Sequence, residues 1–350
     1  MSVANTSNSS EVDYRDKIKV DVSAVLPAYL IVLATCLLGN ILVCITIMKN
    51  QEMRKKRWYY FLINLSISDM GLALFTPVYL LQSAGVDMGD AGCKLGIHII
   101  DTFLVTSVLT LGYISIDRYI CICHPQVTRL RRVHPVWINI GLWVSAIIFL
   151  SPFSIYCYRG KVASNSCDCR SAWPAAVYYR VYKFVLASVW FHIPFLTMIF
   201  CYSKIILQLW GKKGERSSIA YDQSGKKKRS IKMMILATSL FFTSWFPYTV
   251  LYLIKEMNVG DPRIVGKCWL FIQLIAFANS AWNPFTYCVF SIEFREGFKR
   301  VFFWRKERKY RAQEVHSDAL GSKDALEKKR ATRSEHLSDK TGTSQRDVST

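Results

Sequence analysis

Seven apolar stretches, each long enough to cross a lipid bilayer, constrain the fold of this chain more than any other feature. A helix needs about 20 apolar residues to cross a hydrocarbon core about 30 Å thick. Inside a bilayer the backbone must satisfy its own hydrogen bonds, so each span should be a helix. The sequence therefore predicts an all-α membrane protein, a seven-transmembrane helix bundle. The stretches cover residues 24–48, 59–83, 94–122, 136–157, 178–209, 231–254 and 267–290.

The distribution of charge favours a membrane protein over a protein that binds nucleic acid. Of 350 residues, 51% are hydrophobic and 20% are charged, yet the formal charge is +20. Basic side chains that bind nucleic acid would have to interrupt the apolar runs to form a face, and here they lie between the runs. The positive-inside rule places the basic segments that follow spans one, three and five in the cytoplasm. The segments are "KNQEMRKKRW", Arg129 to Arg132, and Lys226 to Arg229.

This orientation predicts four regions of a multi-pass protein of the plasma membrane, with its N-terminus outside and its C-terminus in the cytoplasm. Residues 1–23 are a polar extracellular tail with glycosylation sequons at Asn5 and Asn8, which can be modified only if the tail is exported. Residues 24–290 form the membrane domain. Residues 291–304 alternate apolar and charged side chains at helical spacing, which predicts a short amphipathic helix on the inner leaflet. Residues 305–350 are polar and charged, as expected of a disordered cytoplasmic tail.

Polar side chains lie inside the spans, where an ionisable group is expensive and usually functional. Asp69 in "NLSISDMGLAL" of the second span is the clearest case. Hard oxygen ligands suit a small cation, so Asp69, Ser107 and Asn279 predict a candidate site for an allosteric sodium ion and no other cofactor. The alternative is a hydrogen-bonded cluster that only specifies packing. Further polar residues at comparable depth are Asn40, Ser280 and Asn283.

Short motifs, in order and in the appropriate spans, resemble those of the rhodopsin-type (class A) G-protein-coupled receptors. The resemblance covers residues 24–304. It implies a receptor, not an enzyme, that binds an extracellular ligand, activates a heterotrimeric G protein, and has receptor kinase and arrestin as further partners. The motifs are Gly39–Asn40, Leu65–Asp69, Cys93, Asp117–Tyr119 ("DRY"), Trp143, Pro194 with Tyr202, Ser244–Pro247 ("SWFP") and Asn283–Tyr287 ("NPFTY").

The resemblance also implies an activation switch. Arg118 would be held by the resting bundle and would rearrange with Tyr202 and Tyr287 when the sixth helix swings outward, so that ligand and G protein favour the same shape. The residues implied in coupling and activation are Asp117, Arg118, Tyr119, Tyr202, Phe241, Trp245, Pro247, Asn283, Pro284 and Tyr287.

The ligand is constrained by departures from the family pattern. Phe277 stands where a light sensor carries its retinal lysine, so photoreception is not expected. Aminergic relatives carry an aspartate seven residues after Cys93, but Asp101 comes one residue later, which turns it by about 100° around the helix. A peptide or another small polar ligand is favoured, and an aminergic receptor that uses Asp101 is the alternative. The expected lining is Asp101, Thr102, Trp190, Tyr248, Tyr252 and Gln273.

Two further expectations follow from relatives. Cys93 is expected to form a disulfide with Cys169 or Cys167, with Cys169 preferred and a second bond between Cys157 and Cys167. Many relatives restrain the arginine of "DRY" with an acid on the sixth helix, but the segment Lys226–Lys232 contains none. This absence leads to the hypothesis of elevated basal signalling. The alternative is that Asp117 alone restrains Arg118.

Two other classes of membrane protein share some of these features. A transporter or channel would also place Asp69 at mid-membrane, but such proteins often contain internal repeats, and the halves of this chain show none. An intramembrane enzyme would need a motif such as GxSxG, HExxH or paired intramembrane aspartates, and the sequence has none of them. Agonist, G-protein class and oligomeric state are not indicated by the sequence.

Overall fold

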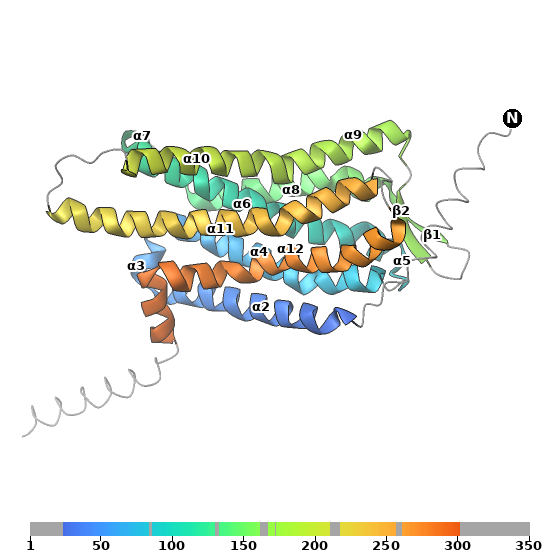
Figure 1. The fold of residues 1–350 in the computed structure, drawn as a ribbon, viewed down its shortest axis with the longest axis horizontal. Helices are drawn as coiled ribbons and strands as arrows, with labels where there is room; N and C mark the ends of the chain where they lie inside the picture. Colours follow the sequence, from blue (N-terminus) through green and yellow to red (C-terminus); the bar gives the residue numbers. More distant parts are fainter. Residues whose placement is uncertain are drawn as a thin grey trace, which may run out of the picture. The chain divides into compact units, whose positions relative to one another are not determined.

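Long helices that lie side by side make up most of the structure (Figure 1). It is a computed structural model that describes residues 24–83, 86–129, 133–161, 167–171, 173–210, 218–256 and 261–301. Residues up to Gly297 belong to one compact unit, and of the second unit, from Phe298 on, only residues 298–301 are described. The long helices are α2 (Leu26–Lys49), α4 (Trp58–Ser83), α6 (Ile97–Cys123), α8 (Pro135–Tyr156), α10 (Ile193–Trp210), α11 (Ser218–Glu256) and α12 (Pro262–Phe290).

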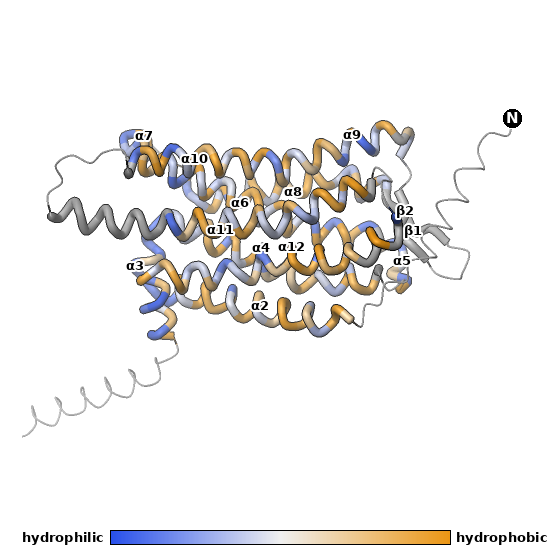
Figure 2. Tube along the Cα trace, viewed as in Figure 1, coloured by the Kyte–Doolittle hydropathy of each residue, from blue (hydrophilic) through white to orange (hydrophobic). Residues whose placement is uncertain are grey.

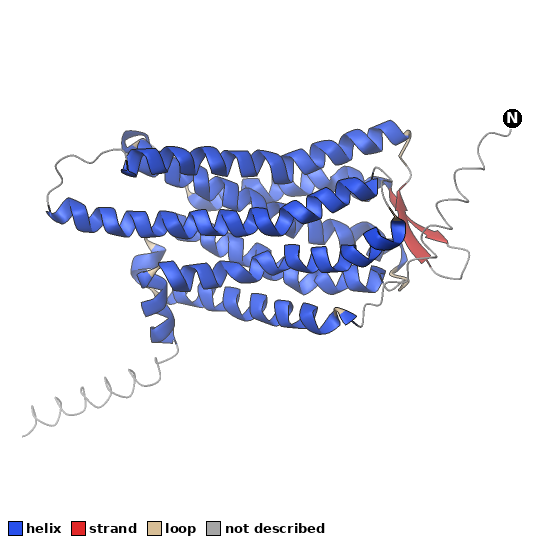
Figure 3. Ribbon diagram, viewed as in Figure 1, coloured by secondary structure: helices blue, strands red, loops and turns tan. Residues whose placement is uncertain are grey.

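Short elements mark the two ends of the bundle (Figure 3). The short helices α3 (Gln51–Arg54) and α7 (Pro125–Arg129) lie at one end, called here the α3 end. The other, called the hairpin end, carries α5 (Gly89–Ala91) and the antiparallel strands β1 (Cys157–Lys161) and β2 (Cys167–Ser171). Wide π-helical turns, η2 (Gly92–Gly96) and η3 (Ser188–His192), lead into α6 and α10, and α9 (Ala176–Ala187) precedes η3.

The helices have the length and composition of membrane spans. Within the described residues, six helical segments are long and apolar enough to cross a membrane. The seventh long helix, α12, has 29 residues but a more polar composition, because it carries the buried polar side chains Gln273, Asn279, Ser280 and Asn283. Since α12 packs along α2 and α11, the seven-helix bundle predicted from the sequence is confirmed.

The bundle exposes large apolar side chains along its helices and buries a set of polar ones within a mainly apolar interior, and both features are unusual in a water-soluble protein. Leu38 on α2 and Ile155 on α8 are each 70% exposed, whereas Asp69 on α4 is fully buried. Figure 2 shows hydrophobic residues along the helices and hydrophilic ones gathered at the α3 end. An apolar surface of this extent is expected to contact lipid.

Close helix contacts explain two of the sequence motifs. A Cβ atom at Gly39 would lie 2.8 Å from Cγ of Pro284, so the glycine allows α2 to approach the "NPFTY" segment of α12. On α8, Trp143 Nε1 donates to Asn64 Oδ1 at 2.9 Å, and Asn64 Nδ2 donates to Thr110 Oγ1 at 2.8 Å. These two hydrogen bonds fix α8 and α4 against α6.

The structure differs from the predicted elements in three places. α11 begins at Ser218, so Lys226–Arg229 lie within a helix and not in a loop as predicted; lysine and arginine are good helix formers, and the helix continues past its apolar segment. α4 contains a proline, Pro77, that the sequence analysis did not single out. The hairpin was also not predicted, because "CYRGK" and "CDCRS" lack the apolar alternation of a half-buried strand.

The strand register contradicts the second disulfide. Cys157 lies opposite Ser171, and Cys167 lies opposite Lys161, so the two cysteines stand at opposite ends of the hairpin. Four residues of strand span about 13 Å, whereas bridged cysteines have Cα atoms less than about 7 Å apart. The predicted bond between Cys157 and Cys167 is therefore wrong.

Candidate functional site

A cluster of polar side chains surrounds Asp69 in the middle of the bundle. Asp69 Oδ1 accepts hydrogen bonds from the hydroxyls of Ser107 on α6, at 2.8 Å, and Ser280 on α12, at 2.9 Å. Its other oxygen, Oδ2, accepts from Asn283 Nδ2 at 2.7 Å. Asn40 on α2 joins the cluster by donating to the backbone carbonyl of Ser280 at 3.2 Å. One buried carboxylate thus ties three helices together, and Asn40 adds a fourth.

The cluster contains oxygens that fit a small cation. Asp69 Oδ1 and the hydroxyl oxygens of Ser107 and Ser280 are hard ligands of the kind that such cations prefer. A hydroxyl rotates freely and offers lone pairs when its hydrogen turns away. The third predicted ligand, Asn279, is buried one residue before Ser280. The oxygens of Asp69, Ser107 and Ser280 therefore fit a small cation, and Ser280 is an addition to the predicted ligands.

The "DRY" segment lies near the α3 end of α6. Arg118 Nη2 donates to Asp117 Oδ2 at 2.8 Å, and the Asp117 side chain is only 1% exposed. A second arginine, Arg57, faces the same carboxylate with 3.7 Å between its Nε and Oδ1. The Arg118 guanidinium also lies 5.4 Å from the ring centroid of Trp58. Neither Arg57 nor Trp58 was predicted for this site, because only the packing of α4 on α6 brings Arg57 to Asp117 and Trp58 to Arg118.

The three tyrosines predicted for the switch have different surroundings. The Tyr119 hydroxyl lies 3.0 Å from Nε2 of His124, and its ring contacts Phe200 with 5.8 Å between centroids. Tyr202 on α10 and Tyr287 on α12 are both buried. Tyr119 therefore faces away from the interior that holds the other two.

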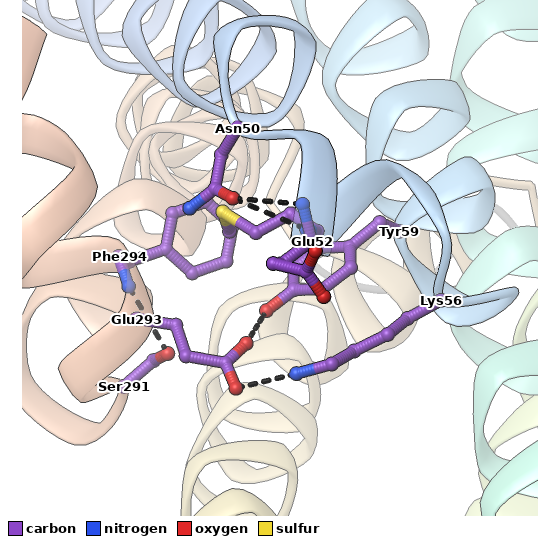
Figure 4. A network of polar contacts seen from close by, with 8 residues as sticks. Asn50, Glu52, Lys56, Tyr59, Ser291, Glu293 and Phe294 are labelled. Atoms are coloured by element: carbon purple, nitrogen blue, oxygen red, sulfur yellow. Dashed lines mark hydrogen bonds and ion pairs between the residues drawn. The ribbon is translucent and has the colours of Figure 1, made fainter.

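A polar network joins the residues after α12 to the beginning of α4 and the segment before it (Figure 4). One oxygen of Glu293 pairs with Lys56 Nζ at 2.5 Å, and the other accepts a hydrogen bond from the Tyr59 hydroxyl. The ring of Phe294 lies between those of Tyr59 and Tyr287, at centroid distances of 5.8 and 5.2 Å. Tyr287 of "NPFTY" is thereby linked through Phe294 to Tyr59, the second residue of α4.

An aromatic cluster occupies the bundle between Asp69 and the hairpin end. Trp245 on α11 is 1% exposed, and its ring meets Trp190 at 5.6 Å, Tyr248 at 5.4 Å and Phe277 at 6.3 Å between centroids. Towards the α3 end, Phe241 follows at 6.5 Å. The predicted residues Trp190, Trp245, Phe241 and Tyr248 are thus in one connected set of rings.

Polar groups border this cluster on the side of the hairpin end. Asp101 Oδ1 accepts a hydrogen bond from the Tyr79 hydroxyl at 2.8 Å, so the aspartate faces α4. Gln273 on α12 is 1% exposed, and its Oε1 has no hydrogen-bond partner among the described residues. Thr102, by contrast, donates back to the carbonyl of His98 at 2.7 Å. Its hydroxyl is therefore used by its own helix.

Lys183 on α9 is a residue that the sequence analysis missed. Its ammonium lies near three aromatic rings from three helices, and no periodicity or motif indicates this arrangement. The rings are Phe153 at 4.7 Å, Tyr179 at 5.4 Å and Tyr252 at 5.4 Å from Nζ to the centroid. Such cation–π contacts keep an ammonium partly dehydrated and fixed in place.

Several predicted residues lie outside the described part of the chain. These are the sequons at Asn5 and Asn8, the tail 305–350, and the side chains of Lys226–Arg229. The side chains of Cys93, Cys167 and Cys169 also lie outside it. The backbone of β1 packs against η2, which contains Cys93.

The chain is similar to known receptors. A family model described as "7 transmembrane receptor (rhodopsin family)" matches residues 39–287. Neuropeptide FF receptor 2 of Mus musculus is 29% identical over 314 residues, which cover 83% of this chain and 75% of that receptor. Tachykinin-like peptides receptor 99D of Drosophila melanogaster is 29% identical over 283 residues, or 76% of this chain and 54% of that receptor. The Substance-P receptor of Homo sapiens is 26% identical over 285 residues, which cover 79% of this chain and 70% of that receptor.

Proposed function

Because the protein belongs to the rhodopsin family of seven-transmembrane receptors, we propose that it binds an extracellular peptide at the hairpin end of the bundle and activates a heterotrimeric G protein at the α3 end. The chain is a multi-pass membrane receptor and not an enzyme. Membership of this family also removes the reason to consider a transporter or channel.

The peptide ligand is supported by the similar receptors and by the chemistry of the hairpin end. The relatives are named for neuropeptide FF, tachykinin-like peptides and substance P. The Oε1 acceptor of Gln273, which has no partner within the part of the chain that the structure describes, suits a ligand N–H, since a buried acceptor without a partner is costly. Aromatic side chains with a few polar groups are typical of a ligand site. The similarity to peptide receptors is the observation that carries the proposal.

An amine ligand is less well supported. Asp101 is the only residue proposed as its counter-ion, and one oxygen of that carboxylate already accepts the Tyr79 hydroxyl. The similar receptors described above are named for peptides and not for amines. The aminergic alternative is therefore not favoured.

The route from ligand to G protein is proposed to run through the aromatic cluster. A ligand that displaces Trp190 or Tyr248 moves Trp245, because their rings are in contact. Trp245 lies two residues before Pro247, and a proline removes a backbone hydrogen bond and favours a bend. A bend at Pro247 moves the part of α11 that lies at the α3 end. At the same end of the bundle, on α6, Arg118 is paired with Asp117.

The remaining features are proposed by analogy with the family. The receptor lies in the plasma membrane with its N-terminus outside, Asn5 and Asn8 glycosylated, and Cys93 bonded to Cys169 or Cys167. Its C-terminus is cytoplasmic and, after phosphorylation by a receptor kinase, recruits arrestin. A sodium ion at Asp69 stabilises the resting bundle. Basic residues next to α3 face anionic lipid head groups.

A screen of neuropeptides on cells that express the chain tests the proposal. With a sensor for each G-protein class present, at least one sensor should respond to at least one peptide. That response should be lost in Arg118→Ala at equal surface expression. Gln273→Leu, which removes the unpartnered acceptor, should weaken binding of that peptide about tenfold. Activation of the receptor by amines and by no peptide would overturn the assignment of a peptide ligand.

A further inference from the structure

The ammonium of Lys183 on α9 lies among three aromatic rings, which are called here the Lys183 cage. Its Nζ is 4.7 Å from the ring centroid of Phe153 on α8, and 5.4 Å from those of Tyr179 on α9 and Tyr252 on α11. The lysine is half-buried, so part of its side chain is withdrawn from water. Aromatic rings around one ammonium are the arrangement by which proteins recognise organic cations. In this cage the cation belongs to the chain itself.

A carboxylate lies near the Lys183 cage. The charge of Lys183 acts on the side chain of Asp101 on α6, and Oδ1 of that carboxylate accepts the Tyr79 hydroxyl at 2.8 Å. Aromatic faces together with a negative charge favour an organic ammonium over other groups. The surroundings that would suit an amine ligand are therefore already supplied with an ammonium by Lys183.

The Lys183 cage is connected to the aromatic cluster of the proposed ligand site. Tyr252 stacks on Tyr248 with 6.4 Å between ring centroids, and Tyr248 meets Trp245 at 5.4 Å. The group that occupies the cage therefore contacts the same series of rings through which the ligand is proposed to act.

We propose that Lys183 is a specificity-determining residue: its ammonium occupies the cation site at the hairpin end of the bundle and so excludes amines as ligands. A second ammonium in the cage would lie against the first, and like charges repel more strongly where water is partly excluded. The part of the peptide that contacts Lys183 is therefore neutral or acidic. The exclusion of amine ligands rests on the proposed function, which places the ligand at the hairpin end, whereas the occupied cage does not.

Truncation of Lys183 tests whether the cage is a cation site. Lys183→Ala deletes three carbons and the ammonium, which correspond to the propylammonium ion used as the probe. In the full chain in nanodiscs, at constant sodium, propylammonium at ten times its Kd should raise the Tm of Lys183→Ala by about 2 °C. The unmodified chain, whose cage is filled, should show no such rise.

Three comparisons separate the cage from nonspecific effects of the probe. Propanol, which is similar in shape but uncharged, should leave the Tm of Lys183→Ala unchanged. Lys204→Ala is the matched control, because Lys204 is exposed and lies near the ring of Phe200, at 5.7 Å, outside the cage. Adding Tyr252→Leu to Lys183→Ala should remove most of the rise. The inference is overturned by no rise in Lys183→Ala, or by an equal rise in Lys204→Ala or in the unmodified chain.

Surface expression in cells gives a second measurement if Lys183→Ala folds poorly. Propylammonium should then raise the amount of this variant at the surface, because a bound ligand stabilises the folded chain. Equal amounts with propylammonium and with propanol would contradict the cation site. Activation of the unmodified chain by an amine would overturn the exclusion of amines. Absence of a response of the unmodified chain to any peptide would instead count against the proposed function, and the melting curves of Lys183→Ala would still decide whether the cage binds a cation.

Discussion

The polar cluster around Asp69 permits a prediction of how two substitutions at one position differ. Asp69→Asn keeps the shape of the side chain. Its amide oxygen can accept from Asn283, while its amide nitrogen can donate to Ser107 and Ser280 once their hydroxyls turn. Asp69→Ala leaves a cavity and removes the acceptor of all three donors.

The magnitudes follow from these contacts. In Asp69→Asn, loss of charge-assisted hydrogen bonds is offset because no charge is buried, so stability should change by less than about 1 kcal/mol. In Asp69→Ala, the hydroxyls of Ser107 and Ser280 can turn to backbone carbonyls, but the amide of Asn283 is left unsatisfied at a cost of about 1–3 kcal/mol. The cavity adds to this cost. Asp69→Ala should therefore be about 2–3 kcal/mol less stable than Asp69→Asn.

Thermal unfolding in detergent measures the difference. For a bundle of this size, about 2–3 kcal/mol corresponds to a Tm difference of roughly 4–5 °C. Ser145→Ala on the exposed face of α8 serves as a control and should melt like the unmodified chain. Equal Tm values for the two Asp69 variants would refute the reasoning. Repeating the melts in sodium chloride and choline chloride tests the cation: sodium should raise the Tm of the unmodified chain and not that of Asp69→Asn.

Three further predictions concern packing, the network after α12, and Asp101. Gly71→Ala should lower stability by about 1–3 kcal/mol, because its Cβ would lie 2.5 Å or less from ring atoms of Phe103 and overpacking is costly. Gly141→Ala has nothing within 4 Å of its Cβ and should raise stability by up to about 1 kcal/mol. Melting curves of the two variants should shift in opposite directions, and Tm shifts of the same sign would contradict the contact between Gly71 and Phe103. Glu293→Gln should cost less than about 1 kcal/mol, because its ion pair with Lys56 is half-exposed. A Tm loss above about 3 °C would show that the pair contributes more than this. Tyr79→Phe should weaken peptide activation through the altered surroundings of Asp101, measured as a shift in half-maximal peptide concentration, whereas an unchanged value would separate this pair from the ligand site.

Local patterns were sufficient to place several functional groups. Asp69 was recognisable because a charge inside an apolar run is rare, and its contacts with Ser107 and Asn283 join residues already singled out by their depth. The residues of "DRY" were recognisable by motif, and Asp117 and Arg118 are indeed paired. Their roles in activation stay predictions.

Other groups were beyond prediction because they depend on how helices rotate against one another. Asp101 was expected at the flank of a ligand site, but only the approach of α4 shows that it meets Tyr79. The position of Lys183 among rings from three helices depends on helix packing in the same way. Nothing in the surrounding sequence distinguishes it from a lysine exposed to water or lipid head groups.

Seven membrane-crossing helices could be deduced from the amino-acid sequence, because apolar length and the need for internal backbone hydrogen bonds are properties of each segment alone. Which side chains share a charge depends instead on how the helices pack. Arg57 is 60 residues before Asp117 in the sequence, and their contact exists because the beginning of α4 packs beside the end of α6. Pairing of this kind is set by helix packing, which no single segment encodes.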